Sequence, residues 1–144
     1  MKQSPASGEG DEALFAFALM HAGKAVEDRV EAALNRADLS LAKFGVLSEL
    51  VRADDSLTLS ELAARCSCVR SNMTQLIDRL EADGLVRRLD DPADRRTVRA
   101  ALTSAGRMQQ AAGDREMKSV LRELAALVGS GDRAHLNRIL EVLS

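Results

Sequence analysis

Residues 57–106 read LTLSELAARCSCVRSNMTQLIDRLEADGLVRRLDDPADRRTVRAALTSAG, and this stretch decides the fold. Thr58 and Glu61 have the spacing of a capping box, in which two side chains satisfy free amide groups at the start of a helix. A second helical pattern follows over residues 70–82, where apolar residues recur at helical spacing. Gly84 comes after this pattern and can adopt the left-handed conformation that often ends helices. The stretch therefore predicts two short helices in close succession.

Two strand-like segments follow the second helix. Residues 85–89 and residues 97–102 predict strands, and residues 90–96 between them predict a polar turn that contains a proline and ends in two arginines. Thr103 is a suitable N-cap for a further helix. The order of these elements predicts a mainly α fold, with a helix-turn-helix beside a small β-hairpin.

Long helices are expected on both sides of this module. Residues 11–35 are rich in Ala, Leu, Glu and Arg and contain no proline, which favours one long helix. A second helix should begin after Ser40, and the helix after the hairpin should continue to about residue 128. Asp132 can then cap a last helix that ends near residue 143. The apolar residues of the first helix cover more than one stripe, so it needs partners on more than one side, either a second subunit or the rest of a monomeric bundle.

Charge is unevenly distributed along the chain. The formal net charge is -2, but residues 65–107 contain nine arginines and six acidic residues, a net of +3, which leaves -5 for the remainder. A basic segment in an acidic chain is typical of a face that binds phosphate groups, although a chance fluctuation in a highly charged surface would give the same pattern. The chain has three Phe, no Tyr and no Trp, so we do not expect an aromatic platform for single-stranded nucleic acid.

The side chains that face outward at the start of the second short helix are of the types that reach base edges in a DNA groove. Arg pairs with guanine, Asn and Gln pair with adenine, and hydroxyl groups contact bases or phosphates. The assignment depends on the neighbouring hairpin, because any short polar helix start offers similar residues. The candidate DNA-reading residues are Arg70, Ser71, Asn72, Thr74 and Gln75.

Arginines of the hairpin strengthen this assignment. Arg95 and Arg96 at its tip can enter a narrow minor groove, where negative potential attracts guanidinium groups. Asp91 and Asp94 would be poor neighbours for DNA unless one of them holds an arginine through a forked ion pair. The alternative is a solvated surface hairpin. The adjoining strand offers two further arginines that could reach phosphates, Arg87 and Arg88.

The hairpin and its exit carry the most specific motif of the chain, Asp94-Arg95-Arg96 followed by LTSAG at residues 102–106. This motif is similar to the D-x-R…LT-x-x-G signature of the MarR family of transcription regulators, and the whole stretch resembles the winged helix-turn-helix of that family. The resemblance implies a homodimer that binds a pseudo-palindromic operator in double-stranded DNA. It also implies that Arg96 enters the minor groove and that Asp94 structures the wing. The expected function is that of a repressor released by a small effector.

The resemblance also divides the chain into parts. Residues 11–37 and 104–144 are expected to form the dimerisation helices, and residues 38–103 the DNA-binding module. Residues 1–10 are polar and are expected to be a disordered lead.

A ligand site is implied by the same resemblance. Members of the family often bind small aromatic acids or phenols between the dimer helices and the winged module. The alternative is that the candidate residues are plain core, as residues of these types at helical spacing usually are. The candidate residues for this pocket are His21, Phe44 and Met73.

The sequence departs from the family pattern at the start of the recognition helix. Val69 stands where the family has Ser or Thr, so Ser67 or Ser71 is the expected local cap. Cys66 and Cys68 stand where apolar residues are usual. They are either small buried hydrophobes or a redox switch, since thiols near a helix N-terminus can have a lowered pKa. Two cysteines without a further His or Cys nearby in sequence do not make a zinc site, so no metal is expected.

Other classes of protein are not favoured. The sequence offers no nucleophile–base pair and no glycine-rich phosphate loop, so we expect no enzyme and no cofactor. No apolar run is long enough to span a membrane and no signal peptide is recognisable, which together with the two cysteines predicts a cytoplasmic protein. The remaining alternative is a winged-helix module that binds protein without specific DNA binding.

Overall fold

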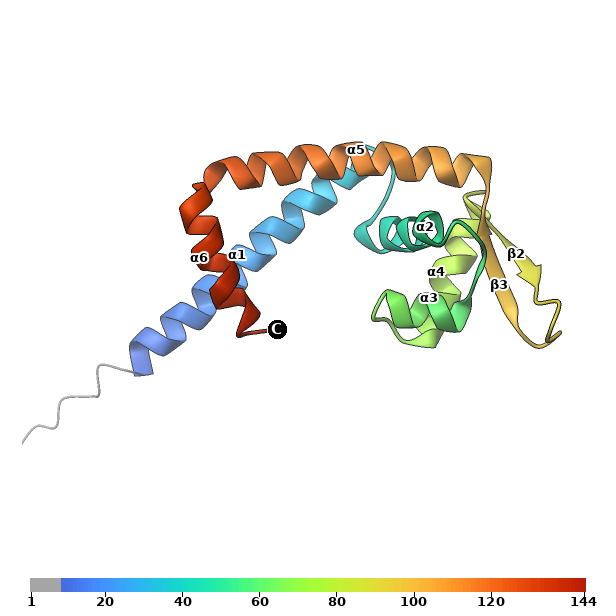
Figure 1. Cartoon of the computed structure of the whole chain (residues 1–144), viewed down its shortest axis with the longest axis horizontal. Coiled ribbons are helices and arrows are strands. Elements are labelled where there is room, and N and C mark those ends of the chain that lie inside the picture. The colour runs from blue at the N-terminus through green and yellow to red at the C-terminus, as the bar shows by residue number, and fades with distance from the viewer. Residues whose placement is uncertain (1–8) are drawn as a thin grey trace, which may run out of the picture.

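The computed structural model describes residues 9–144, and its architecture is mainly α-helical with one small sheet (Figure 1). This confirms the predicted fold class. Most of the expected lead of residues 1–10 lies outside the described residues, but Glu9 and Gly10 already belong to the first helix. The described elements are, in order, α1 (Glu9–Asn35), α2 (Leu41–Ala53), β1 (Leu57–Thr58), α3 (Leu59–Arg65), α4 (Arg70–Ala82), β2 (Val86–Asp90), β3 (Val98–Leu102), α5 (Ser104–Leu127) and α6 (Ser130–Glu141).

The elements from α2 to β3 form a compact module beneath the N-terminal half of α5, and α1 runs away from it (Figure 1). The core of the module is one continuous apolar cluster between α2, α3, α4 and the sheet. Leu34 and Leu39 extend the cluster to the end of α1 and the following turn. The side chains at the centre of the module that are at most 1% exposed are Val46, Leu47, Leu50, Leu62, Met73, Ile77, Leu80 and Ala100.

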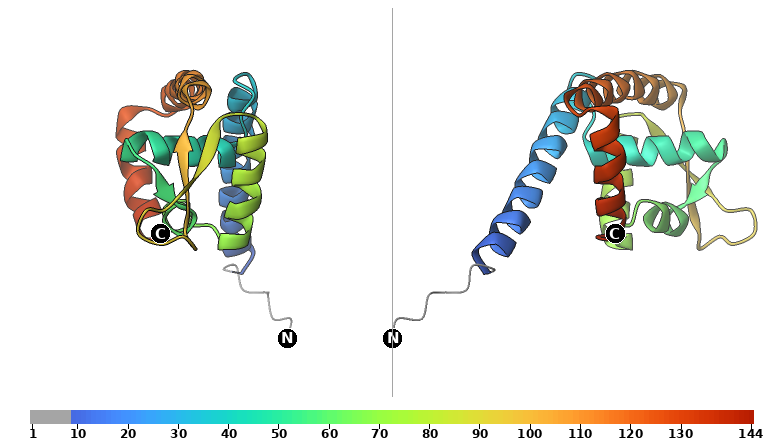
Figure 2. Two further views of the ribbon diagram at one scale, coloured as in Figure 1. Left: turned by 90° about the vertical axis from the view of Figure 1, so that its right-hand side faces the viewer. Right: turned by 60° about the vertical axis from the view of Figure 1, so that its left-hand side comes forward.

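The sheet has three antiparallel strands in the order β1-β3-β2. The hairpin register runs from the Val86–Leu102 pair to the Asp90–Val98 pair, and the β2–β3 turn projects beyond the helices of the module (Figure 2). The sequence did not predict β1, a strand of two residues that pairs with Ala100 and Arg99 of β3.

Local signals placed most helix ends correctly. The side chain of Ser40 accepts a hydrogen bond from the Lys43 amide, and Thr58 and Glu61 form the predicted capping box. Gly84 has a φ of 73°, so it adopts the left-handed conformation that was expected there. The predicted last helix is present, but its predicted start was wrong, because α6 begins at Ser130 after Gly129 and Asp132 lies within its first turn.

The N-terminal half of α1 is not covered by the rest of the described chain. Ala33 and Leu34 near its C-terminal end are buried, and α1 contacts α5 there. Leu14 and Phe17 are 70% and 68% exposed, and Phe15 is 57% exposed. Within one chain, only the C-terminal part of this helix therefore has the partners that its apolar residues were expected to need.

The last helix, α6, folds back from the end of α5 (Figure 1) and has no buried residue among those described. Leu136, Ile139 and Leu140 on it are each about 40% exposed. Among residues 9–144, none of the helices combines the length and the apolar character needed to cross a membrane.

Candidate nucleic-acid interface

Helix α4 presents one polar face and buries the other. Met73, Ile77 and Leu80 are completely buried, so they fix the orientation of the helix on the module. The opposite face at its N-terminal end is open to solvent. The exposed residues there are all five that the sequence singled out, Arg70, Ser71, Asn72, Thr74 and Gln75.

Two hydrogen bonds hold the first turn of α4 in place. The guanidinium of Arg70 donates to the hydroxyl of Ser60 on α3. The hydroxyl of Thr74 donates to the Arg70 carbonyl at 3.1 Å. Ser60 was missed by sequence reasoning because its partner lies ten residues away on another helix. This bond orients the candidate base-reading arginine before any DNA is bound, which lowers the entropic cost of binding.

The amide groups at the start of α4 have no side-chain cap. Val69 is the N-cap residue and is 61% exposed, and neither Ser67 nor Ser71 replaces the missing hydroxyl, so that expectation was wrong. Ser67 instead adopts a left-handed backbone with a φ of 50°. Free amides at a helix N-terminus attract anions, so this end of α4 suits a phosphate group.

The tip of the hairpin is shaped by Asp94. Its Oδ1 atom accepts a hydrogen bond from the Arg96 amide at 2.9 Å, and its Oδ2 atom accepts one from the Thr97 hydroxyl at 3.3 Å. The aspartate thus folds the turn through the backbone, and the expected forked pair with an arginine is absent at this residue in the described chain. Arg95 and Arg96 are exposed and form no ion pair within residues 9–144.

The second aspartate of the turn, Asp91, contacts Arg99 on β3. The Arg99 Nη1 atom lies 3.2 Å from Asp91 Oδ2, and the same guanidinium donates to the Ser56 carbonyl at 2.7 Å. A hydrogen bond from the Ala93 amide, and then Arg99, lower the pKa of Asp91 below its ordinary value. These bonds tie the base of the wing to the segment before β1. From the sequence, either Asp91 or Asp94 was a candidate to hold an arginine, and Asp91 does so. Sequence reasoning missed the bond to Ser56, because this bond joins residues 43 positions apart.

The two arginines of β2 lie on opposite faces of the sheet. Arg88 faces α4, where its guanidinium binds Asp78 and, at 3.0 Å, Glu81. Hydrogen bonding to Asp78 raises the pKa of Arg88. These ion pairs join the wing to the recognition helix, so they disfavour the predicted contact of Arg88 with phosphates. Arg87 is exposed on the other face, beside Asp54 and Arg107 in a shallow pocket, and its contact with DNA stays a prediction.

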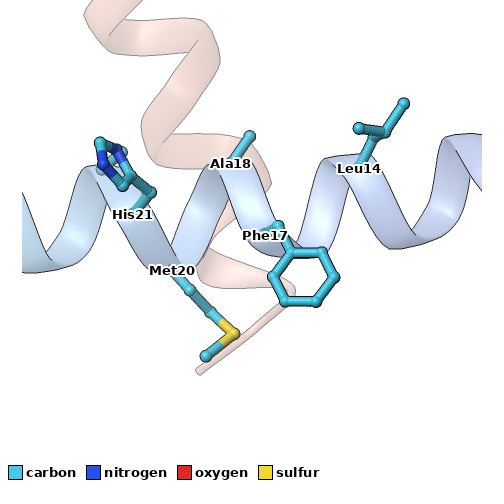
Figure 3. A pocket seen from close by; sticks show the side chains of 6 residues that line it. Leu14, Phe17, Ala18, Met20 and His21 are labelled. Carbon is cyan, nitrogen blue, oxygen red and sulfur yellow. The ribbon is translucent and has the colours of Figure 1, made fainter.

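The three candidate effector residues are not brought together within one chain. His21 lies on an exposed apolar surface of α1 with Leu14 and Phe17 (Figure 3). Met73 is completely buried and lines a different pocket between α2 and α4. Phe44 packs close to Gly113 of α5. A β-carbon added at Gly113 would come within 2.8 Å of the Phe44 ring.

Both cysteines are free, half-buried and packed against the core. Burial, and then the nearby Glu49, raise the pKa of the Cys66 thiol. The lowered pKa expected of a reactive thiol is therefore not found at Cys66, which weakens the redox interpretation there. Cys68 donates a hydrogen bond from Sγ to the Val69 carbonyl at 3.2 Å.

A recognition helix with an open polar face, beside a hairpin with unpaired arginines at its tip, defines the winged helix-turn-helix class of proteins. Residues 37–97 match the sequence model of the MarR family, so this part of the chain is similar to that family.

Relatives and solved structures agree with this assignment. An uncharacterized HTH-type transcriptional regulator of Bacillus subtilis, YsmB, is 34% identical over 88 residues, which are 61% of this chain and 60% of YsmB. The chain thus spans less than two thirds of this curated relative. A solved structure of Sco3205, a MarR family transcriptional regulator from Streptomyces coelicolor in complex with DNA, is similar to this chain. The two sequences are 25% identical, the alignment covers 99% of this chain and 91% of the Sco3205 chain, and the TM-score is 0.82. The transcriptional repressor CouR, solved with a 23-mer DNA duplex, is 28% identical to this chain. The alignment covers 98% of this chain and 99% of the CouR chain, and the TM-score is also 0.82.

Proposed function

We propose that the chain is a sequence-specific, DNA-binding transcription regulator that acts as a homodimer. The observation that carries the proposal is the pairing of an exposed, pre-oriented Arg70 on α4 with the unpaired Arg95 and Arg96 at the wing tip. Two similar proteins, Sco3205 and CouR, were solved with DNA, which supports the same role here. Such a role places the protein in the cytoplasm with the DNA, and it involves no catalysis.

The geometry indicates how each part would contact the duplex. The N-terminal turns of α4 enter the major groove, where Arg70 recognises guanine and Asn72 or Gln75 recognises adenine. The wing lies along the DNA backbone. Arg96 enters the adjacent minor groove, because the Arg96 guanidinium has no partner in the described chain.

A second subunit would cover the apolar surface that one chain leaves open. The exposed residues of α1 and α6 form this surface, and burial of apolar area stabilises association by roughly 25 cal/mol per Å². A two-fold dimer carries two copies of α4, so its operator is pseudo-palindromic.

The regulatory part of the proposal is repression that a small aromatic or phenolic effector relieves. A ligand that binds better to a dimer with badly spaced recognition helices would shift the population away from the DNA-binding form. His21 lies on the surface of α1 that a partner subunit would cover, so a pocket around it would be completed only in the dimer.

The proposal is tested by measuring affinity for a DNA fragment from the promoter of the chain's own gene as a function of salt. Arg70→Ala and Arg96→Ala should each weaken binding, and Arg96→Ala should reduce the slope of log K against log salt by about one, because one phosphate-region charge is lost. Arg88→Gln should leave that slope unchanged, since Arg88 is bound to Asp78 and Glu81. Arg115→Ala, on α5 outside the interface, controls for loss of charge. Wild-type affinity and slope in both Arg70→Ala and Arg96→Ala would show that the assigned surface is wrong.

A further inference from the structure

Three sulfur-containing side chains line one pocket of the winged module. The pocket lies between α2, α3 and α4 and has a volume of about 350 Å³. Cys66, Cys68 and Met73 contribute to its wall, and the remaining wall is largely apolar. The residues that complete the lining are Leu41, Ala42, Gly45, Glu49, Arg65 and Leu76.

The three side chains belong to the turn between α3 and α4 and to the helix ends that flank it. Cys66 is the C-cap residue of α3, Cys68 stands in the turn, and Met73 is in the first turn of α4. Both thiols are free and half-buried, whereas Met73 is completely buried. The sequence alone shows only two neighbouring cysteines, and folding adds the thioether of Met73 to them.

Oxygen and imidazole donors are scarce around these sulfurs. Within residues 9–144, His, Cys, Asp and Glu form no group of three or more that could hold a metal. The one carboxylate of the pocket, Glu49, is bound by Arg52 and lies 3.7 Å from Arg65. A zinc ion, which takes four thiolate, imidazole or carboxylate ligands in structural sites, does not fit this set. Thiolate and thioether ligands select soft ions, Cu(I) among them.

We propose that this pocket is a binding site for a soft monovalent metal ion of the Cu(I) type, held by the sulfur atoms of Cys66, Cys68 and Met73. Binding of the ion would release the two thiol protons to solvent. Two thiolates and one monovalent cation then leave a single negative charge. Arg65 lines the same pocket. Together, Arg65 and Arg52 offset the charge of the ion site and that of the Glu49 carboxylate, which both arginines approach. The α2 residues that line the pocket are apolar except for Glu49.

The site would act on the recognition helix through the turn that precedes it. Ser67, between the two cysteines, has a left-handed backbone, and α4 has no side-chain cap. A bound ion would tie the end of α3 to the start of α4 across this turn. This regulatory step rests on the proposed function, and by linkage the factor by which Cu(I) changes DNA affinity equals the factor by which DNA changes Cu(I) affinity.

The ion is tested directly by competition, without DNA. The full chain, reduced and free of oxygen, is titrated into the coloured Cu(I) complex of bicinchoninate. We expect it to withdraw one Cu(I) per chain, and we expect Cys66→Ser and Cys68→Ser to abolish this. Met73→Leu conserves volume, so the fold is retained, and it should weaken binding by about tenfold or more, because even outer-shell changes cost that much at metal sites. Met108→Leu, at a methionine 74% exposed on α5, is the matched control and should bind as wild type does.

The outcomes separate the site from the proposed function. A wild-type chain that leaves the chelator complex intact, or a Met73→Leu variant with unchanged affinity, overturns the metal site. The second arm measures DNA affinity with and without Cu(I). Cu(I) binding by a chain that binds no DNA specifically would support the site and contradict the regulator. Cu(I) binding that leaves specific DNA affinity unchanged would support the site and contradict its action on α4.

Discussion

Gly106, near the start of α5, lies against the backbone of Leu85. A β-carbon at this position would come within 1.9 Å of the Leu85 carbonyl oxygen, a distance that no side-chain rearrangement relieves. The same carbonyl accepts the Thr103 amide at 3.1 Å, so the strand cannot easily move away. The glycine of the LTSAG run is therefore required by packing between α5 and the residue that precedes β2.

Gly106→Ala should lower the free energy of unfolding by at least about 1–3 kcal/mol, the usual cost of overpacking. Gly45→Ala is the matched control, because a β-carbon there meets nothing within 4 Å and Gly45 lies inside α2. That variant should be stabilised by about 0.5–1 kcal/mol, since alanine favours a helix interior over glycine. Urea unfolding of the two variants decides the matter, and equal stabilities would contradict this account of Gly106.

The residue types at the candidate DNA interface were predictable from the sequence, but their ion pairs and hydrogen bonds were not. The outward positions of α4 follow from helical spacing, because Met73, Ile77 and Leu80 mark the buried face. The strand pattern could not show that Arg88 meets two acids of α4 while Arg87 turns to the other face. That difference depends on which side of the sheet the recognition helix covers.

At the scale of elements, the capping box of α3 should make stability depend on pH. A hydrogen bond from the Thr58 amide lowers the pKa of Glu61 below its ordinary value of 4.5. A lowered pKa in the folded state means that the carboxylate stabilises the fold above its ordinary pKa. The contribution is lost as the pH falls through the lowered pKa.

Glu61→Ala should therefore reduce the free energy of unfolding at pH 7 by less than the ~1 kcal/mol typical of a lost N-cap. The difference from wild type should shrink as the pH is lowered below 4.5. Glu123→Ala, at an exposed carboxylate of α5, should show no such trend. Thermal or urea unfolding across this pH range measures the effect, and a difference that grows on acidification would refute it.

Elements were predictable where a local signal ends or begins them. Ser40, Thr58 and Thr103 each form the expected cap, because an N-cap requires only the next three residues. The two-residue β1 carries no such signal, and its existence depends on β3 lying beside it. Asp132 failed as a cap because the glycine at residue 129 already serves as N-cap and allows α6 to begin earlier.

At the scale of the whole molecule, the exposed apolar face of α1 predicts the dimer. Burial of one phenylalanine side chain stabilises by about 1.5–3 kcal/mol, and a two-fold interface contains two copies of each contact. Phe17→Glu should therefore weaken dimerisation by more than about a hundredfold.

Sedimentation velocity over a range of concentrations measures this change. Ser71→Glu adds the same charge on the exposed face of α4 and is the control, since it should weaken DNA binding but leave the dimer intact. A Phe17→Glu variant that remains as dimeric as wild type would remove α1 from the subunit interface.

The candidate effector residues were the part of the molecule that the sequence placed least well. The three candidate residues share helical spacing with core residues. Within one chain, His21 lies on an open surface of α1, Phe44 packs against α5, and Met73 lies in the core of the module. A site completed by two subunits is encoded in surfaces that meet only after association. The sequence of one chain lists such residues without showing which of them face each other.

The claim that α4 and the wing read DNA as a symmetric pair is tested most directly by selecting bound sequences from a random pool of double-stranded DNA. We predict that the full-length chain enriches one two-fold symmetric motif, with half-sites separated by about 10 base pairs or a multiple of that spacing. The Arg70→Ala variant should relax the preference at one matching position in each half-site. A pool in which no motif is enriched, or a single motif without a second half-site, would contradict the account.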